Sequence, residues 1–73
     1  MISVEVDLAI LELLARDDRL AVDRIADSLG APQNVVAGAM RRLAQQGFVR
    51  RVGATGWALT DAGRDEVRHW RIA

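Results

Sequence analysis

The sequence contains no cysteine. This absence excludes disulfide bonds, zinc sites built from thiolates and cysteine nucleophiles, so packing alone must stabilise the fold. The sequence also lacks any apolar run near the roughly 20 residues that cross a bilayer. Its first residues, MISVEVDLAI, are acidic where a signal peptide would be basic. We therefore expect a cytoplasmic protein with no membrane partner.

Lysine is also absent, and all ten basic residues are arginine. Either selection for bidentate contacts with phosphate or guanine or a GC-rich genome accounts for this choice. Ten acidic residues bring the formal net charge to zero, but the charges are unevenly distributed. Residues 1–30 hold seven carboxylates and three arginines, a charge of −4, whereas residues 31–73 hold three carboxylates and seven arginines, a charge of +4. The total gives no reason to expect nucleic acid, although the second part of the chain is basic.

The 73 residues suffice for one small domain and are too few for two cores. Half of them are hydrophobic (51%), far more than in a disordered chain. The sequence shows no repeat, linker or low-complexity tract. It therefore predicts a single folded domain over residues 1–73.

Apolar residues recur at helical spacing from Val4 to Arg16. One stripe contains Val4, Leu8, Leu11, Leu14 and Ala15, and a second contains Val6, Ile10 and Leu13. An apolar arc this wide is more than one neighbouring layer requires. This helix is therefore either central in the domain or also in contact with a second subunit.

The segments that follow predict a second and a third helix. Residues 17–19 read as a loop and residues 20–21 as a very short strand, before helical spacing returns over residues 22–29. Gly30 is the expected glycine just past a helix end, and Pro32 suits the first turn of the next helix. That helix runs from about residue 32 to residue 46, and four apolar side chains face inward: Val36, Ala39, Met40 and Leu43.

After Gly47 the pattern changes to that of a β-hairpin. Residues 48–52 and 57–59 suit two strands joined by a turn at residues 53–56. Thr60 is a good N-cap for a last helix over residues 61–70. An isolated hairpin is marginal in water, so this one must pack on the helices. The result is a mainly α-helical fold with a small hairpin, a winged helix-turn-helix, in which Trp57 is expected between hairpin and helices.

The sequence resembles the winged-helix transcription regulators of the broad MarR, PadR and archaeal phage-repressor type. The matching residues are Ile10 and Leu11, RIADSLGAP at 24–32, Val35 and Val36, RRLAQQGFV at 41–49, and WALTDAGR at 57–64. The resemblance implies a DNA-binding domain whose third helix enters the major groove and whose wing contacts the backbone or the minor groove. This chain differs in having Ala37 and Gly38 where such regulators often carry a basic or hydroxylated residue, and in having a short wing.

Eight residues form the predicted DNA-binding surface. They are Gln33, Asn34, Ala37, Gly38, Arg41, Arg42, Arg50 and Arg51. Asn and Gln can pair bidentately with adenine and Ala can touch a thymine methyl group, which favours A·T-rich sequence. The arginines are expected at phosphates, and strand alternation places Arg50 and Arg51 on opposite faces, so that only one of them points at DNA.

Each of these residues also has a simpler interpretation. Gln33 and Asn34 are ordinary polar residues for a first helical turn, and Arg41 and Arg42 are ordinary solvated side chains. Glycine inside a helix costs about 1 kcal/mol relative to alanine, so Gly38 has a reason to be there, either close helix packing or close approach to DNA.

We expect a sequence-specific, double-stranded DNA-binding transcription regulator that acts as a repressor. A homodimer through the 4–16 helix and the Trp70 end would double its contacts with DNA. The alternative is a winged helix that binds proteins or serves as a subunit of a larger nucleoprotein assembly, which the zero net charge favours. We expect no enzyme, cofactor or metal, because His69 is the only histidine and has no partner at catalytic or ligand spacing.

Overall fold

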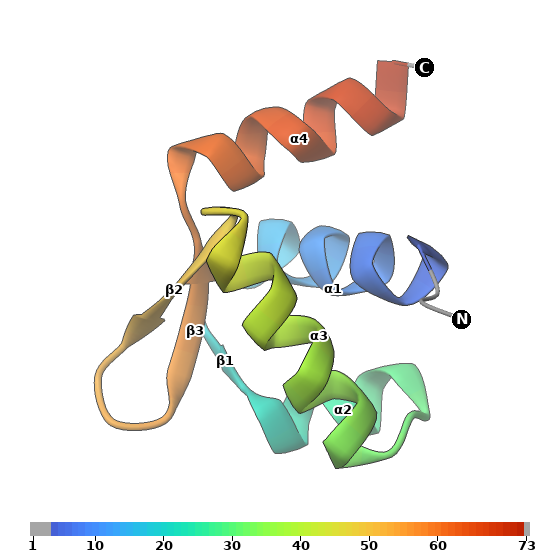
Figure 1. Cartoon of the computed structure of the whole chain (residues 1–73), viewed down its shortest axis with the longest axis vertical. Helices are drawn as coiled ribbons and strands as arrows, with labels where there is room; N and C mark the ends of the chain where they lie inside the picture. The colour runs from blue at the N-terminus through green and yellow to red at the C-terminus, as the bar shows by residue number, and fades with distance from the viewer. Residues whose placement is uncertain (1–3, 73) are drawn as a thin grey trace.

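The computed structural model describes the backbone of residues 4–72 and the side chains of residues 6–70. The elements are α1 (Val4–Arg16), β1 (Leu20–Ala21), α2 (Val22–Leu29), α3 (Gln33–Gln45), β2 (Val49–Val52), β3 (Gly56–Leu59) and α4 (Asp61–Ile72). The strands form one antiparallel sheet in the order β1-β3-β2. Figure 1 shows the β2–β3 hairpin projecting from the helices beside α3, with α1 between α3 and α4. The predicted winged helix-turn-helix is confirmed.

Helix α1 is central in the domain. It contacts α2, α3, α4 and β3, and its apolar side chains from both predicted stripes lie in the core. The fully or nearly buried ones are Ile10, Leu11, Leu13 and Leu14. The wide apolar arc of this helix is therefore used within the chain. Over the described side chains, which exclude that of Val4, it leaves no exposed apolar stripe for a second subunit.

Glycines in the left-handed conformation end two of the helices. Gly30 (φ 65°) follows α2, and Gly47 (φ 82°) follows α3 after Gln46. Behind Gly47, the Phe48 amide donates to the Leu43 carbonyl at 2.9 Å, which satisfies a carbonyl that the helix leaves open. Phe48 thus belongs to the cap of α3, and β2 begins at Val49 instead of Phe48.

Helix α3 begins one residue later than predicted. Pro32 is extended (φ −63°, ψ 145°) and is the N-cap residue, not the first helical residue. Its carbonyl accepts the first helical hydrogen bonds, from the amides of Val35 (3.1 Å) and Val36 (3.2 Å). At the other end of the chain, α4 continues to Ile72, two residues past the predicted end.

The short strand β1 extends the predicted two-stranded wing to a three-stranded sheet. Leu20 pairs with Trp57 and Ala21 pairs with Gly56. Gly56 is therefore a strand residue and not part of the turn, and it lies tightly packed. A Cβ atom there would lie 2.7 Å from the Arg19 side chain and 2.8 Å from the Val52 carbonyl oxygen. Because α2 starts directly after β1, this pairing holds the start of α2 beside the wing.

The start of α4 is hydrogen-bonded to the turn that ends α3. The Thr60 hydroxyl accepts a hydrogen bond from the Gly63 amide at 3.0 Å, as an N-cap should, and donates one to the Gly47 carbonyl at 2.5 Å. A Cβ atom at Gly63 would overlap the carbonyl oxygen of Phe48. Packing thus explains why the sequence has glycine three residues after Thr60, since only glycine lets α4 pass this close to the start of the wing.

Candidate nucleic-acid interface

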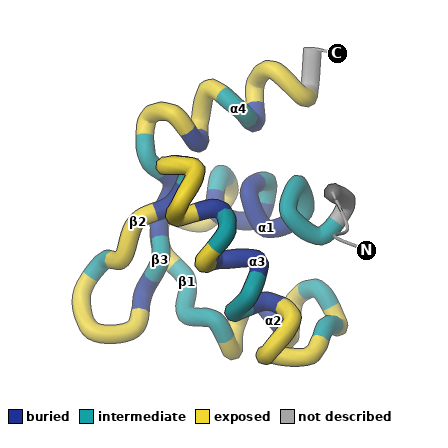
Figure 2. The backbone as a smooth tube through the Cα atoms, in the orientation of Figure 1, coloured by how far each residue is buried: buried dark blue, intermediate teal, exposed yellow. Residues whose placement is uncertain are grey.

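Helix α3 has one buried side and one open side. The four side chains predicted to face inward, Val36, Ala39, Met40 and Leu43, are all buried in the core. Gln33, Asn34 and Arg41 are exposed on the open side, and Ala37 and Gly38 are half-exposed there. Figure 2 shows the same division along the α3 tube, with the exposed wing loop beside it. The described part of the chain therefore does not cover the predicted reading face.

A groove runs between this face of α3 and the wing. Residues from three parts of the fold line it, among them Gln33, Ala37 and Arg41 of α3, Arg51, Thr55 and Trp57 of the wing, and Arg24 of α2. Its floor is formed by Met40 and the half-buried Trp57. The groove thus has an apolar base and three guanidinium groups along its edges. Asp23 also lines it and contributes the opposite charge.

Arg51 is held in place by the wing. One of its terminal nitrogens donates to the Ala54 carbonyl at 3.0 Å. Its guanidinium carbon lies 5.6 Å from the centre of the Trp57 ring, the residue directly across the hairpin, which is cation–π distance. Two contacts therefore restrict a side chain that would otherwise be flexible, and they orient it at the groove.

Arg50, the neighbour of Arg51, lies on the other face of the sheet. It lines a separate hollow with Asp17, Asp18 and Arg19 in the loop after α1. Strand alternation predicts this separation, and the two hollows confirm it. Only Arg51 of this pair lies at the groove.

Arg42 lies on the flank of α3 that faces α1. It forms an ion pair with Asp7 of α1 at 3.1 Å, and the side chains of Arg42 and Asp7 are 37% and 20% exposed. The Arg42 Nε atom is buried and has no hydrogen-bond partner among the described residues. The predicted cluster of four arginines is therefore divided: Arg41 and Arg51 line the groove, whereas Arg42 and Arg50 do not.

Sequence reasoning did not include Arg24, Thr55 or Trp57 in the interface. Arg24 lies in the first turn of α2, and it reaches the groove because β1 pairs with β3 and brings this turn beside the wing. Trp57 packs against the core between hairpin and helices, as expected, but it is only half-buried and also lines the groove. A signal was present in the alternation of β3, which places Trp57 on the same face as Arg51, its cross-strand partner.

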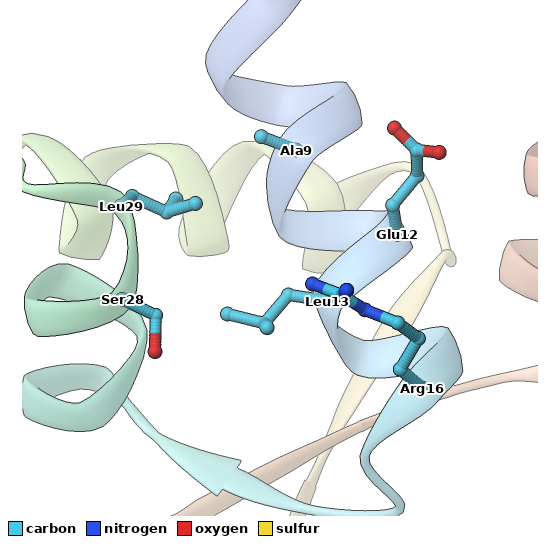
Figure 3. A pocket seen from close by; sticks show the side chains of 6 residues that line it. All are labelled: Ala9, Glu12, Leu13, Arg16, Ser28 and Leu29. Carbon is cyan, nitrogen blue, oxygen red and sulfur yellow. The ribbon is translucent and has the colours of Figure 1, made fainter.

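Another hollow lies between α1 and α2 and shares no lining residue with the groove. Figure 3 shows Leu13 and Leu29 extending toward the space between the two helices, with Ser28 and Arg16 beside it and Glu12 turned away. Its apolar part is the edge of the core, and its charged residues carry opposite signs. Nothing in it assembles a catalytic pair or an anion site.

Among the described side chains of α4, Trp70 is the large apolar one most open to solvent, at 44% exposure. Its indole nitrogen donates to the Glu66 carboxylate at 2.7 Å, and its ring meets His69 edge-on. It borders a small hollow with Leu8, Leu11 and Phe48. The side chain of Ile72, two residues further along α4, lies outside the described side chains. The Trp70 end is therefore the part of the predicted dimer surface that remains exposed.

Within residues 4–72 there is no helix with the length and apolar character needed to cross a bilayer. The described side chains include no cluster of three or more histidine and acidic residues arranged to hold a metal ion.

The family model for the IclR helix-turn-helix domain matches residues 3–53, which span α1 to the end of the wing's first strand. The chain belongs to the IclR helix-turn-helix domain family. The predicted winged-helix regulator type is thus confirmed, and the described groove is the α3–wing face of a DNA-binding domain. None of the curated protein sequences matches the chain.

Solved structures similar to this IclR-type domain include viral and bacterial proteins. The Zα domain of ORF112 from Cyprinid herpesvirus 3, studied in its binding to Z-DNA, is 33% identical with a TM-score of 0.77 over 82% of this chain and 100% of that one. ZitR from Lactococcus lactis is 24% identical (TM-score 0.86; 94% and 56% of the two chains), which shows the shared fold. A MarR-family regulator from Silicibacter pomeroyi is 25% identical (TM-score 0.81; 90% and 49%). The chain thus spans all of the viral domain but about half of each of these two bacterial proteins.

Proposed function

We propose that this domain is a sequence-specific, double-stranded DNA-binding regulator of transcription that acts as a repressor. The observation that carries the proposal is the open side of α3, which adjoins a groove bordered by Arg24, Arg41 and Arg51. In helix-turn-helix proteins the second helix of the motif lies in the major groove and reads base edges. Here that helix is α3, and the wing beside it reaches the backbone or the minor groove.

The first turns of α3 carry the base-reading groups. Gln33 and Asn34 are exposed and can each pair bidentately with adenine, while the Ala37 methyl group can contact the methyl group of thymine. No charged side chain stands between them. We therefore expect an A·T-rich target sequence.

The arginines at the groove supply contacts with phosphate. If Arg24, Arg41 and Arg51 each neutralise one phosphate, the slope of log affinity against log salt is about −3 for one domain, since each contact contributes about −0.9. A domain with so few contacts binds weakly at physiological salt. Arg42 is not in this set because its guanidinium group is already paired with Asp7.

A homodimer would double both the contacts and the slope. Its contact surface is the Trp70 end, because Ile10, Leu11, Leu13 and Leu14 of α1 are buried inside the domain. Two copies of α3 would then read half-sites about one helical turn, roughly 34–36 Å, apart.

Repression fits a small domain because occupancy of a promoter is sufficient to exclude other proteins from it. We propose no catalytic role. His69 is exposed beside Trp70, and the Glu66 carboxylate accepts a hydrogen bond from that tryptophan. A DNA-binding role also implies a location with the DNA, and we propose the cytoplasm.

Selection of bound duplexes from a random pool tests the proposal. The expected result is an A·T-rich consensus whose binding is lost in the double variant R41A/R51A and retained in R50A. Recovery of no preferred sequence would contradict sequence-specific regulation.

A second candidate is recognition of left-handed DNA. It is favoured by the 33% identity to the herpesvirus Zα domain, whose whole length this chain covers. In that case α3 and the wing would read the shape of the backbone, not base edges. Circular dichroism of an alternating CG duplex, titrated with the domain, separates the candidates, because only a Z-DNA binder inverts the spectrum.

A protein-binding winged helix, or a subunit of a nucleoprotein assembly, is the remaining alternative. Zero net charge and the uncharged first turns of α3 favour it. It predicts no binding to any duplex even at low salt, where electrostatic attraction to DNA is strongest.

A further inference from the structure

Gly38 lies in the middle of α3, where glycine is among the least favourable residues for helix stability. Its backbone does not require glycine, because the positive-φ glycines of the described chain are Gly30, Gly47 and Gly53. Any residue with a Cβ atom could adopt the same helical geometry. The choice of glycine therefore needs another physical reason.

Packing within the chain does not supply that reason. Among the described residues, a Cβ atom at Gly38 would meet only the tip of the Arg42 side chain, at 3.8 Å, which is an ordinary contact with a flexible group. Gly63 shows what a packing requirement looks like, since a Cβ atom there would overlap the carbonyl oxygen of Phe48. Of the two reasons for Gly38, close packing against the described part of this chain is therefore not the one that applies.

The surroundings of Gly38 on the helix point outward. Asn34 lies one turn before it and Arg41 lies about one turn after it, and both are exposed on the open side of α3. A gap without a side chain is thus flanked along the helix by groups that can donate hydrogen bonds. Such an arrangement lets a partner contact the helix backbone at the gap while the flanking side chains reach it.

We propose that Gly38 is a specificity-determining residue at which the backbone of α3 comes closest to the edges of the base pairs. This inference rests on the proposed function and adds to it the depth at which the helix docks. A side chain at this position would hold α3 away from the base edges at the floor of the DNA major groove. Hydrogen bonds from Asn34 would then lengthen past about 3.5 Å and be lost. Glycine at this position lowers the stability of the helix and allows closer contact with DNA.

The experiment compares G38A and G38L with the unchanged domain, since Ala and Leu both favour helix over Gly. Thermal unfolding is expected to show a rise in Tm of about 4–8 °C for G38A, given the size of the domain. Fluorescence anisotropy with the selected duplex is expected to show about tenfold weaker binding for G38A, as overpacking of a fitted surface causes, and a larger loss for G38L.

S28A is the matched control, because Ser28 is exposed on α2 beside the separate α1–α2 hollow. It adds helix stability without touching the groove, so its Tm should rise slightly and its duplex binding should not change. The control separates an effect of the side chain at position 38 from an effect of stability itself.

Two results would overturn the inference while leaving DNA binding in place. One is equal duplex affinity of G38A, G38L and the unchanged domain, and the other is a lower Tm for G38A, which would reveal a packing role. If the unchanged domain binds no duplex of either handedness, the proposed function itself fails and this inference fails with it.

Discussion

The two flanks of α3 differ in what the chain does with their arginines. On the wing flank, Arg41 and Arg51 line an open groove, and Arg51 is oriented by an aromatic ring and a carbonyl. On the α1 flank, Arg42 is bound to Asp7 and holds two helices together. Arg41 and Arg42 are adjacent in sequence, yet successive residues of a helix are 100° apart around its axis. Arg41 therefore lies at the open groove and Arg42 lies against α1. Adjacent charge is therefore no evidence of shared function.

The hairpin shows a similar difference between two adjacent arginines, because successive side chains of a strand point to opposite faces of the sheet. Arg51 faces Trp57 and the groove, whereas Arg50 faces the loop that contains Asp17 and Asp18. A patch that looks like four equivalent cations in the sequence thus contributes two to the interface. Of the other two, Arg42 is paired with Asp7, and Arg50 lines a hollow with Asp17 and Asp18.

The largest expected effect is that of removing both groove arginines. We expect R41A/R51A to bind the selected duplex at least about 100-fold more weakly, because each charge-assisted hydrogen bond contributes about 1.5 kcal/mol or more. The salt slope should become shallower by about 2. Anisotropy titrations at several salt concentrations measure both quantities. An unchanged slope would show that these arginines do not neutralise phosphate.

The next largest effect concerns the other flank and appears in stability. R42A leaves Asp7 without its cation, so we expect unfolding to become easier by about 1 kcal/mol, the upper range for a pair that solvent partly screens. In a domain of this size that lowers Tm by about 4–8 °C. Duplex binding and its salt slope should stay as they are.

A double-mutant cycle with D7A provides the control for this prediction. The D7A and R42A effects on unfolding should be coupled by about 0.5–1 kcal/mol, as expected for residues in contact. If R42A instead reduces the salt slope by one unit, Arg42 exchanges Asp7 for phosphate on binding, and the two flanks are not distinct.

A smaller effect is expected when Arg51 keeps its charge but loses its planar group. R51K should weaken duplex binding about threefold, because a lysine loses much of the stacking on Trp57, worth about 0.5–1 kcal/mol at an exposed site. The salt slope should not change, since the charge is retained. A loss as large as that of R51A would show that shape, not charge, determines the contribution of this residue.

The smallest effect is expected at Arg50. R50A should change duplex affinity by less than about twofold and unfolding free energy by less than about 0.5 kcal/mol, as is usual for an exposed side chain outside a binding surface. The same titrations and melts measure it. A loss comparable with that of R41A would extend the interface to the other face of the sheet.

Much of the fold could be predicted from local patterns. The inward residues of α3, the glycine that ends each of two helices, the hairpin and the Thr60 cap each follow from spacing or residue type over a few positions. The differences are also local. Pro32 caps α3 because its extended ψ lies outside the helix, and Phe48 serves the α3 cap before the strand begins.

The candidate site was predicted less completely. Gln33, Asn34, Ala37, Gly38 and Arg41 share the open side of α3, as helical periodicity requires. Arg24 and Trp57 were missed because they reach the groove through the pairing of β1 with β3, two strands 35 or more residues apart in sequence. Arg42 was assigned to the interface because nothing in its own segment indicates Asp7 as a partner.

Periodicity, turn residues and caps fixed the order and type of the elements, because these signals act within one or two turns of the chain. Only the tertiary structure decided which cations remain available to a ligand and which serve the fold. That decision depends on contacts between residues far apart in sequence, such as Asp7 with Arg42, 35 positions away. It also depends on a strand of two residues, β1, that is stable only when β3 is beside it.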